Sequence, residues 1–183
     1  MRIILTTCLL MISMASYGQE ALFPKKTFSM SIGYGFGVGG ERSVFSAVPV
    51  QLEYGVFNIG TRASFGVGLL TSFGWGTYPM RYYGQKERDC IYQAAPQFLF
   101  HVTALKKWEF YAGVGAGIQV RTIRGINLEE DGMWYFNDSY TTQIKFYPQI
   151  KIGSRVQIGN HLGIYLEAGY RIILLNAGVS IRF

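Results

Sequence analysis

The chain ends in Leu175-Asn176-Ala177-Gly178-Val179-Ser180-Ile181-Arg182-Phe183, which has a regular alternation of side chains. Every second side chain from Leu175 to Phe183 is apolar, and the residues between them are polar or glycine. An alternation with a period of two is typical of a β-strand with one apolar face. Val179, Ile181 and Phe183 lie on that face, so we expect the strand to end on an aromatic residue at the apolar surface.

The same alternation recurs in seven earlier segments. They cover residues 28–38, 50–56, 62–73, 92–102, 110–121, 144–156 and 162–170. Most of these segments are about as long as a tilted strand must be to cross a membrane. An even number of strands also brings both ends of the barrel sequence to the same side of a membrane.

The connections between these segments alternate in length. The first, third and fifth are long and cover residues 39–47, 74–91 and 122–143. The second, fourth and sixth are short and cover residues 57–61, 103–107 and 157–161, and a very short connection around Ile173-Leu174 breaks the rule. Short periplasmic turns and longer outer loops are usual in membrane barrels. The sequence therefore predicts an all-β, eight-stranded, antiparallel up-and-down transmembrane β-barrel.

The two faces of the predicted strands differ in composition. One face is apolar, and the other carries Gly, Ser, Gln, Glu, Lys and Arg. A soluble β-sandwich or a lipocalin-like barrel is the alternative, because a slip of one residue exchanges the faces. In a soluble fold the glycines would face water, whereas in a narrow barrel they make room for inward side chains such as Tyr111, Tyr147 and Tyr165. The 23 glycines therefore favour the membrane barrel.

Residues 1–18 resemble a secretory signal peptide. Arg2 supplies the charge, residues 3–14 form a short apolar run, and small residues precede an expected cleavage after Gly18. The apolar run is too short to span a membrane as a helix. Residues 19–183 are then the barrel domain, in which Cys90 is the single cysteine and cannot form an internal disulfide.

The alternation, the mixture of glycine and aromatic residues and the terminal Phe183 together resemble the small eight-stranded outer-membrane barrels, the OmpA/OmpX-like superfamily. The resemblance covers nearly all of residues 19–183. It implies residence in the outer membrane of a Gram-negative cell, insertion by the barrel-insertion machinery, and contact with outer-membrane lipids and lipopolysaccharide. The junction at Gly18-Gln19 resembles signal peptides common in Bacteroidota.

Eight strands leave an interior that side chains fill, so no general pore is expected. We expect a charge network there, because an unpaired carboxylate is costly to bury. A turn centred on Gly159 would place Lys151 directly across from Glu167, with Arg155 one step toward the periplasm. A turn at Asn58-Ile59 would place Glu53 opposite Ser64 and diagonal to Arg62. The predicted lumen network is Glu53, Arg62, Lys151, Arg155 and Glu167.

The third long connection combines acidic and aromatic residues. Its candidate recognition residues are Glu129, Glu130, Asp131, Trp134, Tyr135 and Phe136. Clustered carboxylates can bind a cation, and aromatic rings can stack on a sugar or dock a partner. The alternative is that the rings anchor in lipid head groups. The second long connection is basic and tyrosine-rich between Tyr78 and Arg88, which suits lipopolysaccharide phosphates.

Few residues in the sequence are candidates for a catalytic role. The chain holds two histidines, and the His-x-Ser pattern of lipid A deacylases is absent. His101 is expected to face Glu109 as a hydrogen-bonded pair near the periplasmic rim, and His161 to lie in a turn. We assign no catalytic residue, no cofactor, no metal site and no nucleic-acid partner.

The predicted function is a non-enzymatic structural or surface-interaction role, with a protein or glycan ligand at the outer loops. Barrels that the chain resembles serve as scaffolds, adhesins or secretion components. Two alternatives remain open at this point: a lipid-modifying enzyme, of the lipid A deacylase or acyltransferase kind, and an accessory barrel of a secretion or transport system.

Overall fold

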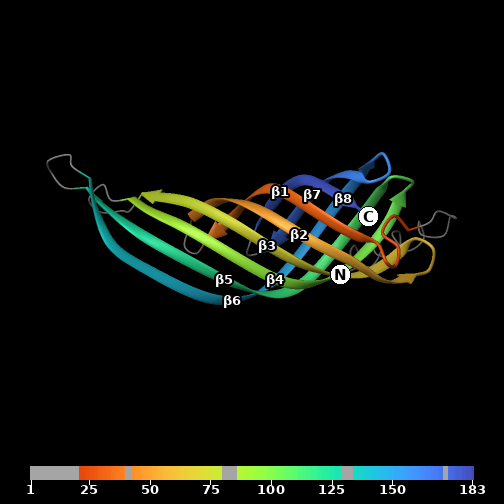
Figure 1. The fold of residues 1–183 in the computed structure, drawn as a ribbon, viewed down its shortest axis with the longest axis horizontal. Coiled ribbons are helices and arrows are strands. Elements are labelled where there is room, and N and C mark those ends of the chain that lie inside the picture. The colour runs from red at the N-terminus through yellow and green to blue at the C-terminus, as the bar shows by residue number, and fades with distance from the viewer. Residues whose placement is uncertain (1–20, 40–42, 80–85, 129–133, 171–172) are drawn as a thin grey trace, which may run out of the picture.

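Eight antiparallel strands close into one barrel in sequence order, as the alternation predicts (Figure 1). The computed structural model describes residues 21–39, 43–79, 86–128, 134–170 and 173–183. The strands are β1 (Phe28–Gly39), β2 (Ser43–Ile59), β3 (Ala63–Pro79), β4 (Lys86–Leu105), β5 (Trp108–Leu128), β6 (Trp134–Ile158), β7 (Leu162–Tyr170) and β8 (Leu175–Arg182). None of the residues in these ranges forms a helix long and apolar enough to cross a membrane.

The two ends of the barrel differ. Tight connections join β2 to β3, β4 to β5 and β6 to β7 at one end, which we call the turn end. Gly60 and Gly159 have φ angles of +69° and +78° there, a conformation that glycine adopts without steric cost. The ends of the barrel sequence meet at the same end, because Phe183 N donates to Phe28 O over 2.9 Å. We call the opposite end the loop end.

Pairing of β8 with β1 closes the barrel. The register runs from Ser29 opposite Arg182 to Phe36 opposite Leu175. The predicted closure residues Val179, Ile181 and Phe183 point outward and are exposed. Gly178 is required at this seam, because a Cβ atom there would collide with the backbone carbonyl of Ile32.

The strands have very unequal lengths. β4, β5 and β6 have 20, 21 and 25 residues, whereas β7 and β8 have 9 and 8. The sheet of β3 to β6 therefore projects well beyond the rest of the barrel at the loop end (Figure 1). Much of the predicted long connections 74–91 and 122–143 is strand, which corrects the sequence prediction. The backbone pairing continues there, but the alternation fades and no longer marks the strands in the sequence.

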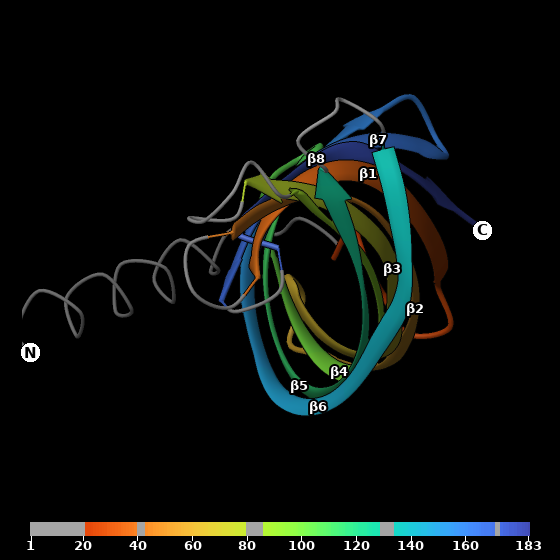
Figure 2. The ribbon, with the colours of Figure 1, turned by 90° about the vertical axis from the view of Figure 1, so that its left-hand side faces the viewer.

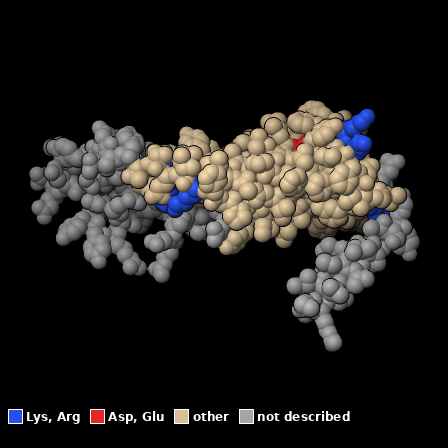
Figure 3. Space-filling view, turned by 90° about the horizontal axis from the view of Figure 1, so that it is seen from below, with Lys and Arg blue, Asp and Glu red and all other residues tan. Residues whose placement is uncertain are grey.

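The outer surface is apolar around the middle of the barrel. Large outward side chains such as Val114, Ile150 and Phe98 are more than half exposed. Figure 3 shows one face of the molecule, where lysine and arginine gather toward the ends and leave the middle largely free of charge. Outward rings pack on one another near both ends, for example Phe73 on Trp75 and Trp108 on Phe110. Such a band with aromatic girdles is typical of a surface that meets lipid.

A β-bulge in β2 changes the register of the lumen. The pairing with β3 shifts between Gly55 and Phe57, so Val56 is the extra residue. Phe57 then takes the outward position and stacks on Phe65, with ring centroids 5.1 Å apart. The sequence pattern placed Val56 on the outward face and did not predict the bulge.

Candidate functional site

The turn half of the lumen holds a cluster of buried charges, which we call the lumen charge network. Its carboxylates are Glu53, Glu109 and Glu167, and its cations are Lys151, Arg155 and Arg182; all six are at most 7% exposed. Inward positions of β2, β5, β6, β7 and β8 supply these side chains. Figure 2 views the barrel from its loop end and shows the strands curving around this interior.

Arg155 lies at the centre of the network. Its Nη2 atom donates to both carboxylate oxygens of Glu53, over 3.0 and 3.1 Å, and its Nη1 atom donates to Glu109 Oε1 over 3.1 Å. The guanidinium also lies over the Tyr111 ring, 5.1 Å from its centroid. Forked contacts of this kind are strong because both groups are charged and their geometries match.

Lys151 and Glu167 form a second pair, with Nζ and Oε2 2.9 Å apart. Tyr111 Oη donates to the same carboxylate over 3.1 Å, and Lys151 Nζ also bonds to Gln51 Oε1. The predicted register was wrong by two residues, since Lys151 lies across from Gly169 and Glu167 across from Gly153. The contact forms nevertheless, because the lysine side chain is long enough to reach diagonally across the two strands.

Glu53 differs from its prediction. It lies across from Gly68 rather than Ser64, because the turn lies farther along the chain than predicted; the bulge in β2 reverses one residue of that shift. Its carboxylate therefore meets Arg155 instead of the expected Arg62. Arg62 is buried at the turn end, where its backbone carbonyl accepts a hydrogen bond from Thr103 N over 2.9 Å.

Glu109 and Arg182 are network members that the sequence reasoning did not assign. Besides Arg155, Glu109 contacts Arg182 Nη2 at 2.6 Å and His101 Nδ1 at 3.2 Å. Both residues occupy inward positions of their strands. The sequence predicted the contact of Glu109 with His101, but it did not identify the two arginines as partners of Glu109. A separate pair, the buried Asp89 with the partly buried Arg121, lies nearer the loop end, where Arg121 Nε donates to Asp89 Oδ2 over 2.8 Å.

Residues 21–27 close the lumen at the turn end, a feature the sequence did not reveal. Phe23 is fully buried and stacks on His101, with ring centroids 4.4 Å apart. Leu22 N donates to Thr103 Oγ1 over 2.7 Å, and Leu22 O accepts from Arg182 Nη1 over 2.6 Å. We call this segment the mouth plug.

Replacing Phe23 by leucine is expected to destabilise the folded barrel by roughly 1 kcal/mol. Leucine keeps most of the buried apolar volume but loses the ring stacking on His101. Urea unfolding in lipid vesicles measures the change, and Phe146→Leu, which alters an outward ring that is 82% exposed, is the control. A mouth plug that contributes nothing to stability would leave the Phe23→Leu midpoint equal to that of the wild type.

An apolar cluster fills the lumen toward the loop end. It contains Phe45, Ala47, Ile91, Ala95, Tyr147 and Ile173. Ile173, two residues before β8, is only 7% exposed, so its side chain points into the lumen. Side chains thus fill the lumen at three levels: the mouth plug, the lumen charge network and the apolar cluster.

His101 has neighbours of the types found in catalytic triads. Ser64 is its cross-strand partner on one side, and Glu109 contacts its Nδ1 atom on the other. However, neither Ser64 Oγ nor His101 Nε2 has a hydrogen-bond partner within the described ranges, and Phe23 covers the imidazole face. A nucleophile needs contact with its base and access to substrate. His161 lies in a turn, as expected, where its ring contacts Arg182 O over 2.9 Å.

The projecting sheet leaves one long strand edge without a partner. β6 pairs with β7 only from Ile150 to Ile158, although it begins at Trp134. In the part of the chain that the structure describes, nothing pairs with residues 134–149 on that side. Pro148 lies within this stretch, and proline is tolerated where a strand has a free edge.

The candidate recognition residues divide between two environments. Trp134, Tyr135 and Phe136 belong to β6 and face Leu128, Asn127 and Ile126 of β5, so they are not in a loop as predicted. Glu129, Glu130 and Asp131 lie outside the described residues. Within the described ranges, no three His, Cys, Asp or Glu residues gather closely enough to hold a metal ion.

Comparison with known proteins identifies the fold. No family model matches the sequence, and no curated protein matches it. Among solved structures, the chain is similar to Ail, the attachment invasion locus protein of Yersinia pestis, in a structure that also contains the heparin analogue sucrose octasulfate. The TM-score is 0.51, with 12% identity over 87% of this chain and 99% of that chain. The N-terminal β-barrel domain of Pseudomonas aeruginosa OprF gives 0.51 and 14% identity over 87% and 98%. The chain therefore has the fold of the small eight-stranded outer-membrane barrels.

Proposed function

We propose that this protein is a non-enzymatic outer-membrane barrel that acts at the cell surface through its projecting sheet. The observation that carries the proposal is the contrast between the two ends of the molecule. Side chains fill the lumen, whereas β3 to β6 extend past the barrel and, among the residues that the structure describes, nothing pairs with the outer edge of β6. A free strand edge offers unpaired N–H and C=O groups to an extended segment of another protein.

The orientation follows from the connections. In barrels of this type the short turns face the periplasm and the longer loops face outward. The turn end would then face the periplasm, and the projecting sheet would stand above the outer leaflet. Residues 1–18 would direct export as a signal peptide, and the barrel-insertion machinery would place the chain among outer-membrane lipids and lipopolysaccharide.

A polyanionic glycan is the second candidate ligand. The structure of Ail contains a heparin analogue, which gives a precedent on a barrel of the same fold. In this chain Lys145 is exposed on the part of β6 that extends past its pairing with β7, toward the loop end. Basic side chains at that end would attract sulfate or phosphate groups.

Shortening the projecting sheet tests the surface role. Arg124 of β5 pairs with Tyr140 of β6, so replacing residues 125–139 by Asn-Gly should close a tight hairpin below the missing tip. We expect normal amounts of folded protein in the outer membrane but at least tenfold weaker adhesion of the expressing cells to surfaces coated with heparin or with extracellular-matrix proteins. Equal adhesion by both forms, or none by the wild type, would contradict the proposal.

The matched control removes charge at the opposite end. A Lys25→Ser, Lys26→Ser variant changes exposed residues before β1 and should adhere like the wild type. The enzyme alternative is tested in parallel, since release of an acyl chain from labelled lipid A by the purified barrel would overturn the non-enzymatic role. Stoichiometric co-purification with a secretion component would favour the accessory alternative instead.

A further inference from the structure

The outward side chains of β4 to β8 alternate in size around the barrel. One row across these strands reads Phe100, Ala112, Ile152, Ala168 and Leu175. The next row toward the turn end reads Val102, Phe110, Ser154 and Leu166. In each row, small side chains therefore lie between large ones. The small side chains leave hollows in the outer surface of the barrel.

These hollows join into one groove with a volume of about 490 Å³. Its floor is formed by Ala112, Gly153, Ser154 and Ala168, and its walls include Phe100, Phe110, Leu166 and Leu175. Tyr111 lies beneath the floor, because a Cβ atom at Gly153 would collide with its ring. The groove is thus a nearly wholly apolar depression in the outer surface of the barrel, with Tyr111 at its base.

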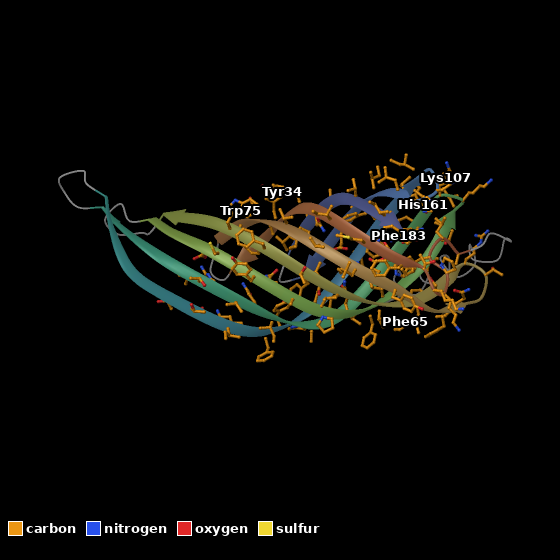
Figure 4. All side chains as sticks on the ribbon, in the orientation of Figure 1. Tyr34, Phe65, Trp75, Lys107, His161 and Phe183 are labelled. Atoms are coloured by element: carbon orange, nitrogen blue, oxygen red, sulfur yellow. The ribbon has the colours of Figure 1, made fainter. Side chains whose placement is uncertain are left out.

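The turn end of the groove is polar and basic. Ala104, the last lining residue on β4, lies next to the turn that contains Lys106 and Lys107. Trp108 Nε1 donates to Ser154 Oγ over 2.5 Å, and Gln157 N donates to Lys107 O over 2.8 Å, which fixes this rim. Lys106 and Lys107 are both exposed, and Figure 4 shows Lys107 at the same end of the barrel as His161 and Phe183.

We propose that this groove binds one glycerophospholipid, with an acyl chain lying over Ala112, Ser154 and Ala168 and its phosphate at Lys106 and Lys107. An apolar groove of this depth gains by covering its lining with hydrocarbon. The paired lysines attract an anionic phosphate, and the tryptophan suits the boundary between head groups and acyl chains. The inference rests on the proposed orientation, which places the turn end at the periplasmic leaflet.

A phospholipid fits this surface better than a second copy of the chain. A second copy would have to bring a complementary ridge and would bury Lys106 or Lys107 against a surface whose own turn end is also basic. A phospholipid instead has an acyl chain that matches the apolar groove and a phosphate that matches the basic rim.

Native mass spectrometry of the purified barrel, released from micelles containing phosphatidylglycerol, tests the proposal. We expect one retained phosphatidylglycerol per barrel. Ala112→Leu fills the floor and should lower the retained fraction at least fivefold, and Lys106→Ser with Lys107→Ser should lower it to a similar extent. Ala116→Leu adds the same volume to an outward position of β5 outside the groove and should retain lipid like the wild type.

Three outcomes would overturn the inference: retention that Ala112→Leu leaves unchanged, equal loss in Ala116→Leu, or a barrel dimer in place of the lipid-bound monomer. Heat modifiability on gels checks that each variant is folded. If a variant does not fold, the milder variants Ala112→Val and Ala168→Val are used instead. The assay uses purified protein, so its failure would leave the proposed surface role standing. Conversely, a shortened variant that loses adhesion but still retains the lipid would leave the lipid site unaffected.

Discussion

Replacing Arg155 by methionine is expected to destabilise the barrel by about 3–5 kcal/mol, the usual cost of removing one partner from a buried ion pair. Arg155 donates to both Glu53 and Glu109, which are each 1% exposed. Methionine fills much of the volume but leaves Glu53 without its cation in a lumen that side chains already fill. Urea unfolding in lipid vesicles, followed by tryptophan fluorescence, measures the loss.

A double variant separates charge from packing. Arg155→Met combined with Glu53→Gln removes the stranded charge, because Glu109 keeps Arg182 as its partner, and we expect the double variant to recover at least half of the lost stability. Lys25→Met alters an exposed lysine at the turn end and should leave the midpoint unchanged. If the double variant were as unstable as Arg155→Met alone, the loss would come from packing and the electrostatic explanation would be wrong.

Val114→Arg is expected to cost about 2–4 kcal/mol, the range measured for arginine facing lipid near the bilayer midplane. Val114 points outward from the part of β5 that pairs with both β4 and β6, and it is 53% exposed. Ile158→Arg introduces the same side chain at an outward position at the turn end of β6, where the cost should fall to about 0–1 kcal/mol. Equal costs at the two depths would show that the outer surface does not meet hydrocarbon.

The sequence predicted the strand number, the antiparallel order and the direction of most side chains, because lipid on one side and a packed lumen on the other impose a period of two. It could not predict the register. The bulge at Gly55 and Phe57 and the positions of the turns shift the pairing by a few residues without altering the alternation on either side. Glu53 was therefore paired with the wrong arginine, whereas Lys151 still reached Glu167.

Two other features carry no periodic signal. The outer parts of β4, β5 and β6 continue the strand pairing beyond the alternating segments. The sequence therefore predicted loops there, and it placed Trp134 in a loop instead of in β6. Phe23 lies before the first alternating segment, in a stretch whose only structural cue is its position next to β1. Its burial depends on the width of the lumen and on the ring of His101, and neither can be derived from local sequence.

Quenching of a single outward tryptophan by brominated lipid tests the central claim most directly, namely that the apolar outer surface faces the hydrocarbon of a membrane. The variant carries Val114→Trp with Trp75, Trp108 and Trp134 replaced by phenylalanine, and it is folded into vesicles of lipid brominated along the acyl chains. The account predicts strong quenching of the tryptophan emission by the brominated lipid and little quenching by aqueous iodide. Strong quenching by iodide with none by brominated lipid would contradict it.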